Sequence, residues 1–391
     1  MTIPTTAARR YTPLEMLSRL VAFDTVSAKS NLDLIAFVAD YLESWGVPSI
    51  RIPNAEGDKA ALFASIGPAD RGGIVLSGHT DVVPVAGQAW SSDPFTLRIA
   101  DGRAYGRGAV DMKGFVALGL ALVPDFLAAD LTTPIHLFLS YDEELTCLGV
   151  VDGIARMGRD LPLPRAVIVG EPTSLEIADA HKGIRTFNTI VTGFAAHSSK
   201  PHLGASAVHA GALLAAELDR MAQELMERAD PADRFDPPYD TVHVGKLHGG
   251  IARNILADRC ELGWEVRTLP GSDPDEVPGR FAAYAETVLA RMRRTAPSSA
   301  ITTVMTSDVP GLAPDAGSSA ETLAMRLAGR NSTIAVPYAT EAGHFQRAGL
   351  PTVVCGPGSI DQAHQPDEFI TLEQLAAGEA FMRDLMESCR S

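Results

Sequence analysis

Short apolar runs bounded by glycine and proline recur along this chain, and they restrict its possible folds more than any other feature. Each run is apolar on both faces, which is typical of strands buried on both sides in a mostly parallel sheet. Helical patterns, such as the one over residues 114–122, separate the runs. We therefore predict an α/β fold, with strands at residues 61–66, 74–77, 135–141, 166–170 and 352–355.

The middle of the chain has a different pattern. Strand-like runs at residues 187–194, 241–247, 259–268 and 300–305 alternate with two long helical stretches, 206–226 and 274–293. Their β-α-β-β-α-β order is the ferredoxin-like arrangement. A chain of 391 residues also exceeds what a single core usually holds. We predict a first domain made of residues 1–182 and 306–391, interrupted by an inserted α+β domain at 183–305.

Two domains in tandem would be the alternative. Insertion is preferred because the segment after the inserted block carries a loop with a histidine, His364. This histidine completes a set of candidate ligands from motifs that precede the insert. The first domain should begin with a helix, since Thr12 and Glu15 form a capping box around Pro13. We also expect a second helix between about Asn31 and Gly46, a sheet that resumes near Val336, and a last helix over residues 372–386.

Composition excludes several classes of function. The formal net charge of −15 argues against nucleic acid and against an anionic membrane surface as partners. No apolar run is long enough to cross a bilayer, and residues 1–17 lack the apolar stretch of a signal peptide. The four cysteines (Cys147, Cys260, Cys355 and Cys389) have neither the spacing nor the density of a disulfide framework. A cytoplasmic location is therefore expected.

Two early motifs place a histidine and an aspartate beside strand or helix ends. His79 follows the run 74–77, and Asp81 lies two residues further, where a carboxylate can orient a metal-bound imidazole. Asp111 lies in the glycine-rich segment 106–114, which is typical of a tight loop before a helix. Taken singly, each motif also fits a structural role, as a hydrogen-bonded histidine or a helix cap.

Acidic residues end two successive strands. Asp142, Glu143 and Glu144 follow the run 135–141, and Glu171 follows the run 166–170. Such carboxylates often belong to solvated loops, but the carboxyl ends of strands are also where open α/β sheets bind ligands. Buried carboxylates repel one another unless cations compensate them. His364, in a rigid loop rich in glycine and proline after the last strand, adds a second histidine.

These residue types form a mixed nitrogen and oxygen ligand set, which suits zinc or cobalt better than magnesium. Five protein ligands are too many for one catalytic zinc with an open position. They suit two metal ions ~3.5–4 Å apart that share a carboxylate. The set predicts a site for two metal ions.

In this order the motifs resemble the metallopeptidase family of acetylornithine deacetylase, succinyl-diaminopimelate desuccinylase, carboxypeptidase G and the aminoacylases. The resemblance covers essentially the whole chain. It implies a zinc-peptidase-like catalytic domain, an inserted lid and dimerisation domain, and a homodimer formed through that insert. It also implies two Zn2+ ions, with Co2+ as an alternative, and a small N-acyl amino acid as substrate.

The resemblance further implies a role for each site residue. Asp111 would bridge the two metals, His79 and Glu171 would complete one site, and Glu144 and His364 the other. Glu143 would be the general base, and Asp81 would hold His79. In the insert, the segment 193–198 resembles the family's Gly-x-x-x-His-Ser signature, so His197 would reach the partner subunit's site and polarise the scissile carbonyl. Arg253 and Asn254, in a turn similar to the family's substrate-binding turn, are candidates to bind the substrate carboxylate.

Within the family, segments 141–149, 340–345 and 362–366 are most similar to acetylornithine deacetylase. The expected reaction is therefore removal of the acetyl group from N2-acetyl-L-ornithine, a step of arginine biosynthesis. Another N-acyl-amino-acid amidohydrolase, such as a desuccinylase or an aminoacylase, is the alternative. A non-catalytic binding protein on the same fold would be expected to have lost a ligand or the base, whereas all six positions are filled here.

Overall fold

The computed structural model of the protein describes residues 8–68 and 71–390, which belong to two compact units. Unit 1 comprises Met1–Ala180, Pro314–Ile334 and Thr340–Ser391, and unit 2 comprises His181–Ala313 and Ala335–Ala339. Unit 2 thus interrupts unit 1 along the chain. Residues 306–313, which the sequence pattern places in the first domain, belong to unit 2, and 306–309 extend its last strand. Residues 1–7 of the segment tested for a signal peptide lie outside the described residues.

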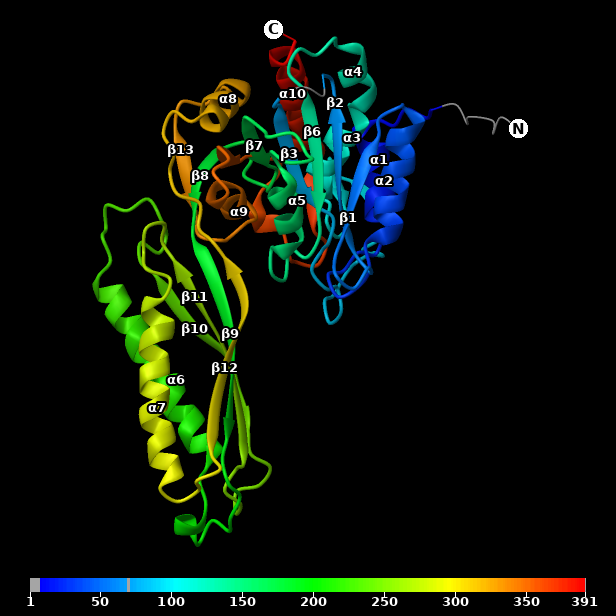
Figure 1. The fold of residues 1–391 in the computed structure, drawn as a ribbon. Coiled ribbons are helices and arrows are strands. Elements are labelled where there is room, and N and C mark those ends of the chain that lie inside the picture. The colour runs from blue at the N-terminus through cyan, green and yellow to red at the C-terminus, as the bar shows by residue number, and fades with distance from the viewer. Residues whose placement is uncertain (1–7, 69–70, 391) are drawn as a thin grey trace. The chain divides into compact units, whose positions relative to one another are not determined.

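Unit 1 is built on an eight-stranded sheet, as Figure 1 shows. β3 is parallel to both its neighbours, β6 and β7, and β14 is parallel to β7. β2 is antiparallel to β6 and to β1, and β8 is antiparallel to β14, so the α/β sheet that we predicted is parallel at its centre and antiparallel toward both edges. In spatial order the strands are β1 (Ser49–Pro53), β2 (Ala60–Ile66), β6 (Ile135–Ser140), β3 (Ile74–His79), β7 (Ala166–Val169), β14 (Thr352–Val354), β8 (Ile177–His181) and β13 (Thr333–Val336).

Helices cover both faces of this sheet, and strand β6 shows why. Leu137 and Leu139 pack toward α3, while the ring of Phe138 between them packs against α5 and against Phe345 of α9. Because successive side chains of a strand point to opposite faces, an unbroken apolar run requires cover on both. The helices of unit 1 are α1 (Pro13–Val21), α2 (Leu32–Ser44), α3 (Lys113–Ala121), α4 (Val123–Ala128), α5 (Val151–Arg156), α8 (Ser319–Ala328), α9 (Ala342–Arg347) and α10 (Leu372–Ser388).

The predicted helix signals act as expected. Thr12 accepts the backbone N–H of Glu15, and the Glu15 carboxylate accepts the backbone N–H of Thr12, which completes the capping box. Helix α2 ends before Gly46, whose φ of +76° is a left-handed conformation that glycine adopts without strain. The buried residues of α2 include Leu34, Ile35, Val38 and Leu42, which share one face of the helix.

Unit 2 has a four-stranded antiparallel sheet in the order β10 (Thr241–Gly249), β11 (Arg259–Thr268), β9 (Gly183–Thr192) and β12 (Ala300–Val309). The long helices α6 (Ala207–Glu227) and α7 (Glu276–Arg293) cover one face of it (Figure 1). Their core centres on Trp264, whose ring stacks on Phe187 at 4.1 Å between centroids and contacts Phe281 at 4.6 Å. This order of elements is the one that the sequence pattern predicts for the insert.

Short elements complete the structure. A three-stranded sheet has the order β15 (Phe369–Thr371), β5 (Arg103–Tyr105) and β4 (Arg98–Ala100), and it brings the segment after His364 beside the segment before Asp111. Three 3-10 turns cover Leu148–Val150, Pro201–Leu203 and Ile360–Gln362. Across residues 8–68 and 71–390, no helix combines the length and apolar character that a membrane span requires.

Candidate metal centre

The candidate site lies in unit 1, at the carboxyl ends of neighbouring strands. β6, β3, β7 and β14 run parallel side by side, so the loops that leave them meet at one edge of the sheet. His79 is the last residue of β3, and Glu171 follows β7 by two residues. The acidic turn follows β6, and the loop of His364 follows β14. Parallel pairing therefore gathers residues that are nearly 300 positions apart in the chain.

Asp111 lies between the two histidines. Its Oδ1 is 3.1 Å from Nε2 of His79, and its Oδ2 is 3.2 Å from Nε2 of His364. The side chain of Asp111 is only 5% exposed. One buried carboxylate thus offers a separate oxygen to each imidazole, as a bridging ligand between two ions would.

Each histidine also faces a glutamate. Nε2 of His364 is 3.0 Å from Oε2 of Glu144, and Nε2 of His79 is 3.8 Å from Oε1 of Glu171. His79 thus lies near Asp111 and Glu171, and His364 lies near Asp111 and Glu144.

The residues present fit a pair of divalent cations. Glu171 Oε1 is buried and has no hydrogen-bond partner among the described residues, although a buried carboxylate oxygen normally has one. Two groups of possible ligands, one of His79, Glu143 and Glu171 and the other of His79, Asp111 and Glu144, have their ligand atoms within 4.8 Å of one another. The donors are imidazole nitrogens and carboxylate oxygens, which zinc and cobalt accept.

The pKa values of the candidate ligands also indicate that the cluster carries uncompensated negative charge. Burial raises the pKa of Glu144 to about 7, and the nearby charge of Asp111 adds to this shift. Burial likewise raises the pKa of Glu171 well above its usual range. Hydrogen bonds with Asp111 and Glu144 raise the pKa of His364 to about 10. Without cations, protons are thus retained by the cluster to compensate its buried negative charge.

Asp81 holds His79 in a different way from the one we predicted. The closest atom to Nδ1 of His79 is the backbone carbonyl oxygen of Asp81 at 2.9 Å, while carboxylate Oδ1 is 3.6 Å away. The carboxylate instead accepts the hydroxyl of Ser27 at 2.6 Å and the backbone N–H groups of Glu143 and Glu144 at 3.2 and 3.3 Å. Asp81 therefore positions the acidic turn as well as the imidazole.

Glu143 lies beside the ligands. It belongs to a group with His79 and Glu171, and its backbone is fixed by Asp81. The thiol of Cys147 is 3.3 Å from its Oε1. Burial raises the pKa of Glu143 well above its usual range, with a smaller contribution from the charge of Glu144. Its carboxyl group is thus suited to take up a proton.

One buried carboxylate near the site was not assigned a role from the sequence. Glu341 is 1% exposed and accepts the hydroxyl of Ser77 in β3 and, at 2.6 Å, the hydroxyl of Ser140 in β6. It thus links the two strands just before they deliver His79 and the acidic turn. The only signal in the sequence was its place in segment 340–345, which we used to compare family branches rather than to assign a function.

The remaining predicted residues belong to unit 2, where they lie close together. His197 and Ile255 form a β-bridge, and the backbone N–H of Ser198 donates to the carbonyl of Asn254 at 3.0 Å. His197, Arg253 and Asn254 are exposed. Nδ1 of His197 accepts the backbone N–H of Ser199 at 3.2 Å, which leaves Nε2 for other contacts.

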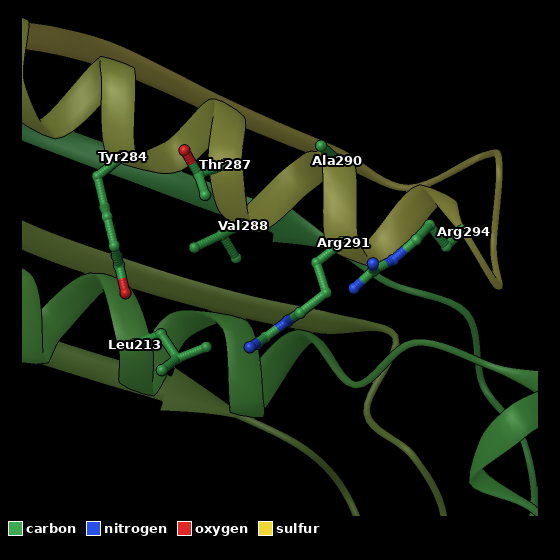
Figure 2. A pocket seen from close by; sticks show the side chains of 7 residues that line it. All are labelled: Leu213, Tyr284, Thr287, Val288, Ala290, Arg291 and Arg294. Atoms are coloured by element: carbon green, nitrogen blue, oxygen red, sulfur yellow. The ribbon is translucent and has the colours of Figure 1, made fainter.

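A surface groove in unit 2 lies apart from these residues. Figure 2 shows that it runs between α6 and α7, with Tyr284 and Arg291 of α7 directed toward α6. It contains no acidic residue and no histidine, so it is not a metal site. Its lining residues are Leu213, Tyr284, Thr287, Val288, Ala290, Arg291 and Arg294.

Comparison with known proteins agrees with this geometry. Residues 75–388 match the model of peptidase family M20/M25/M40. The chain belongs to this family. It is accordingly a metal-dependent hydrolase, and the matched region includes every ligand candidate from His79 to His364.

Solved structures share the whole fold. A tripeptidase from Staphylococcus aureus has a TM-score of 0.75 and 17% identity, over 98% of this chain and 100% of that one. An M20 family metallo-carboxypeptidase from Sulfolobus solfataricus has a TM-score of 0.75 and 18% identity, over 96% of this chain and 99% of that one. A dinuclear metal binding peptidase of the M20 family from Bacillus subtilis has a TM-score of 0.64 and 14% identity, over 96% of each chain. At these identities the structures establish the fold, not the substrate.

Proposed function

We propose that this protein hydrolyses N2-acetyl-L-ornithine to acetate and L-ornithine, a step of arginine biosynthesis. The observation that carries the hydrolytic part is the position of Asp111, with one carboxylate oxygen toward each histidine. The choice of substrate rests on segments 141–149, 340–345 and 362–366, which are most similar to acetylornithine deacetylase.

Two divalent ions would be held around Asp111. His79 and Glu171 would complete the ligands of one ion, and Glu144 and His364 those of the other. The imidazole and carboxylate donors favour Zn2+, with Co2+ as the alternative. When bound, such ions lower the pKa of water and polarise a carbonyl oxygen.

Glu143 is the proposed general base. It would accept a proton from the attacking water and return it to the amine that leaves, so that one water is consumed for each amide bond broken. Its place beside His79 and Glu171 supports this role. Asp81 would keep Glu143 in place through the hydrogen bond to its backbone N–H.

Unit 2 is proposed to form the homodimer and to complete the substrate site. His197 would donate to the carbonyl oxygen of a substrate in the partner subunit, where negative charge develops during attack. Arg253 and Asn254 would bind the substrate carboxylate. Their exposure and their closeness to one another support this role. We further propose a reducing cytoplasm as the location, which the four buried free thiols favour.

A substrate panel tests the proposal. The Zn2+-loaded protein would be incubated with N-acetylornithine, N-succinyl-diaminopimelate, several other N-acetyl amino acids and unblocked dipeptides and tripeptides, and the released amine would be measured. We expect the highest kcat/KM with N-acetylornithine. Preference for the succinyl compound or for another acetyl amino acid would show that N-acetylornithine is the wrong substrate, but the proposal of metal-dependent amide hydrolysis would stand.

A peptidase is the second candidate, because similar structures include a tripeptidase and a metallo-carboxypeptidase. Peptides differ from acylated amino acids mainly in the free amino group next to the scissile bond. Hydrolysis of the peptides in the panel without hydrolysis of any N-acetyl amino acid would establish this candidate. No hydrolysis of any compound by metal-loaded protein would contradict both.

A further inference from the structure

A buried carboxylate outside the ligand set holds the backbone of Asp111. Glu368 is 1% exposed, and its Oε1 accepts the backbone N–H groups of Val110 at 3.0 Å and of Asp111 at 3.2 Å. The carbonyl oxygen of Glu368 accepts the backbone N–H of Gly106 at 2.9 Å. Both ends of the loop that carries Asp111 are therefore bound to one residue.

Arg107 pairs with this carboxylate. Its Nη1 is 2.6 Å from Oε2 of Glu368, and each side chain is only 1% exposed. The guanidinium carbon lies 5.0 Å from the centre of the Trp90 ring. A buried charge is retained only where it is paired and hydrogen-bonded, so neither Arg107 nor Glu368 can move without the other. The pair makes the loop of Asp111 stiff.

Gln88 extends this network to the second histidine. Its Oε1 accepts Nη2 of Arg107 and Nε1 of Trp90, and its amide nitrogen donates to the carbonyl oxygen of His364 at 2.9 Å. The two donors to Oε1 determine which way the amide points. Next to it, Ser91 donates its backbone N–H and its hydroxyl to Asp367 at 3.0 and 2.8 Å.

We propose that Gln88, Arg107 and Glu368 act as one brace, which sets the distance between Asp111 and His364 and thereby the affinity for the ion these two residues share. The inference rests on the proposed metal site. All three are positioning residues: Glu368 and Gln88 hold the backbone of Asp111 and His364, and Arg107 holds Glu368 and Gln88. His79 and Glu171 follow β3 and β7 directly and are held by sheet pairing. His364 lies in a loop well after β14, so its position relative to Asp111 depends more on the brace than on sheet pairing.

The test compares two affinities within one protein. Apoprotein would be titrated with Zn2+ in competition with a chromophoric chelator, which yields separate dissociation constants for the tighter and the weaker ion. For Glu368→Gln, we expect one of the two ions, the one whose affinity His364→Ala also lowers, to lose ~10–100-fold in affinity, the usual effect of removing a partner of a metal ligand. Gln88→Ala should weaken the same ion by less, and the other ion should change little in both variants.

Two controls separate this effect from a loss of fold. Gln88 is only half-buried, so its variant should keep the melting temperature of the apoprotein, and it decides the question if Glu368→Gln does not fold. Glu379→Gln, which removes an exposed ion pair with Arg383 on α10, should leave both affinities unchanged. Raising free Zn2+ above the weakened dissociation constant should restore kcat without changing KM.

Failure of the brace and failure of the metal site give different results. If the wild-type protein binds no Zn2+, the metal site and the brace are both wrong. If the wild-type protein binds two ions and the folded brace variants bind both with unchanged affinity, only the brace is wrong. An equal loss for both ions would also overturn it, because that result would indicate a general loosening of unit 1.

Discussion

The two units carry their predicted functional residues in opposite ways. In unit 1, Asp111, Glu171 and His79 are at most 5% exposed, whereas the side chain of His364 is 51% exposed and faces Asp111 and Glu144. In unit 2, His197, Arg253 and Asn254 are exposed, and the His197 side chain contacts Ser199, two residues away. The candidate ligands of unit 1 are held in place before any ion binds, whereas the candidate substrate-binding residues of unit 2 keep their polar atoms accessible.

This contrast follows from the work proposed for each group. Metal ligands must be held in position before the ion arrives, and the cost of bringing carboxylates together is met by the rest of unit 1. A group that binds a substrate carbonyl needs free hydrogen-bonding atoms and needs its geometry only in the complex. Unit 1 should therefore respond to metal and pH, and unit 2 should respond to neither.

Removal of the metals tests this contrast most strongly. Dialysis against a chelator should abolish hydrolysis and lower the melting temperature of unit 1, because uncompensated carboxylates then remain buried. The stabilisation by bound ion would be about 4 kcal/mol when the free ion is ~1,000 times its dissociation constant. Calorimetry with and without Zn2+ measures it. A shift of the transition of unit 2 by the same amount would show that the units do not respond separately.

Replacement of the base gives the next largest effect. Glu143→Ala should lower kcat by ~10²–10⁴-fold, since the proton acceptor is lost, while both metal ions stay bound. Metal content would be measured together with turnover. Asp152→Ala, an exposed acid on α5, is the matched control and should keep full activity. Near-normal turnover of Glu143→Ala would remove Glu143 from the mechanism.

The exposed histidine of unit 2 should matter for turnover but not for metal. His197→Ala should lower kcat by ~10²–10³-fold, as loss of one donor to a developing oxyanion does, with unchanged metal content. His202→Ala, an exposed neighbour, should have no such effect.

Subunit exchange tests the dimer. Inactive His197→Ala and Glu143→Ala proteins, mixed and allowed to exchange, should regain activity, since each mixed dimer contains one intact site. Absence of recovery, with mixed dimers demonstrated by mass spectrometry, would contradict a contribution across the dimer.

Dependence on pH is the smallest expected difference. In metal-free protein the pKa of Glu144 is raised to about 7 and that of His364 to about 10, so the folded state binds these protons more tightly than the unfolded state. Stability from these groups is complete at low pH, is lost for Glu144 between about 4.5 and 7, and is lost for His364 between about 6.5 and 10. Unfolding of unit 1, followed by denaturant at a series of pH values, should show this decline, and metal should suppress it. A decline of equal size in unit 2 would contradict this origin.

Much of the fold could be predicted from the sequence because burial leaves a direct pattern. The strands of unit 1 that are apolar on both faces, and every element of the predicted insert, lie where periodicity places them. β8 was missed because Asp179 and His181 interrupt its apolar character although all its residues are buried. β4, β5 and β15 were missed because three residues are too few to show a period.

The residues of the candidate site likewise fall into those that could be predicted from the sequence and those that could not. Residue types at strand ends were enough to propose five metal ligands, since chemistry limits which side chains hold zinc, and the family resemblance implied Glu143 as the base. The network of Glu368, Arg107 and Gln88, the carboxylate of Glu341 between two strands, and the hydrogen bonds of Asp81 to the acidic turn had no comparable signal. Each depends on loops that are distant in sequence and meet only after the strands have paired.

The sequence by itself determined the order of strands and helices in unit 2, the longer buried strands of unit 1 and the set of residues available for metal chemistry, because these follow from local periodicity and side-chain type. Only the tertiary structure decided that Asp111 directs one oxygen to His79 and the other to His364. The physical reason is parallel pairing of β6, β3, β7 and β14, which brings distant loops to one edge and buries their charges together.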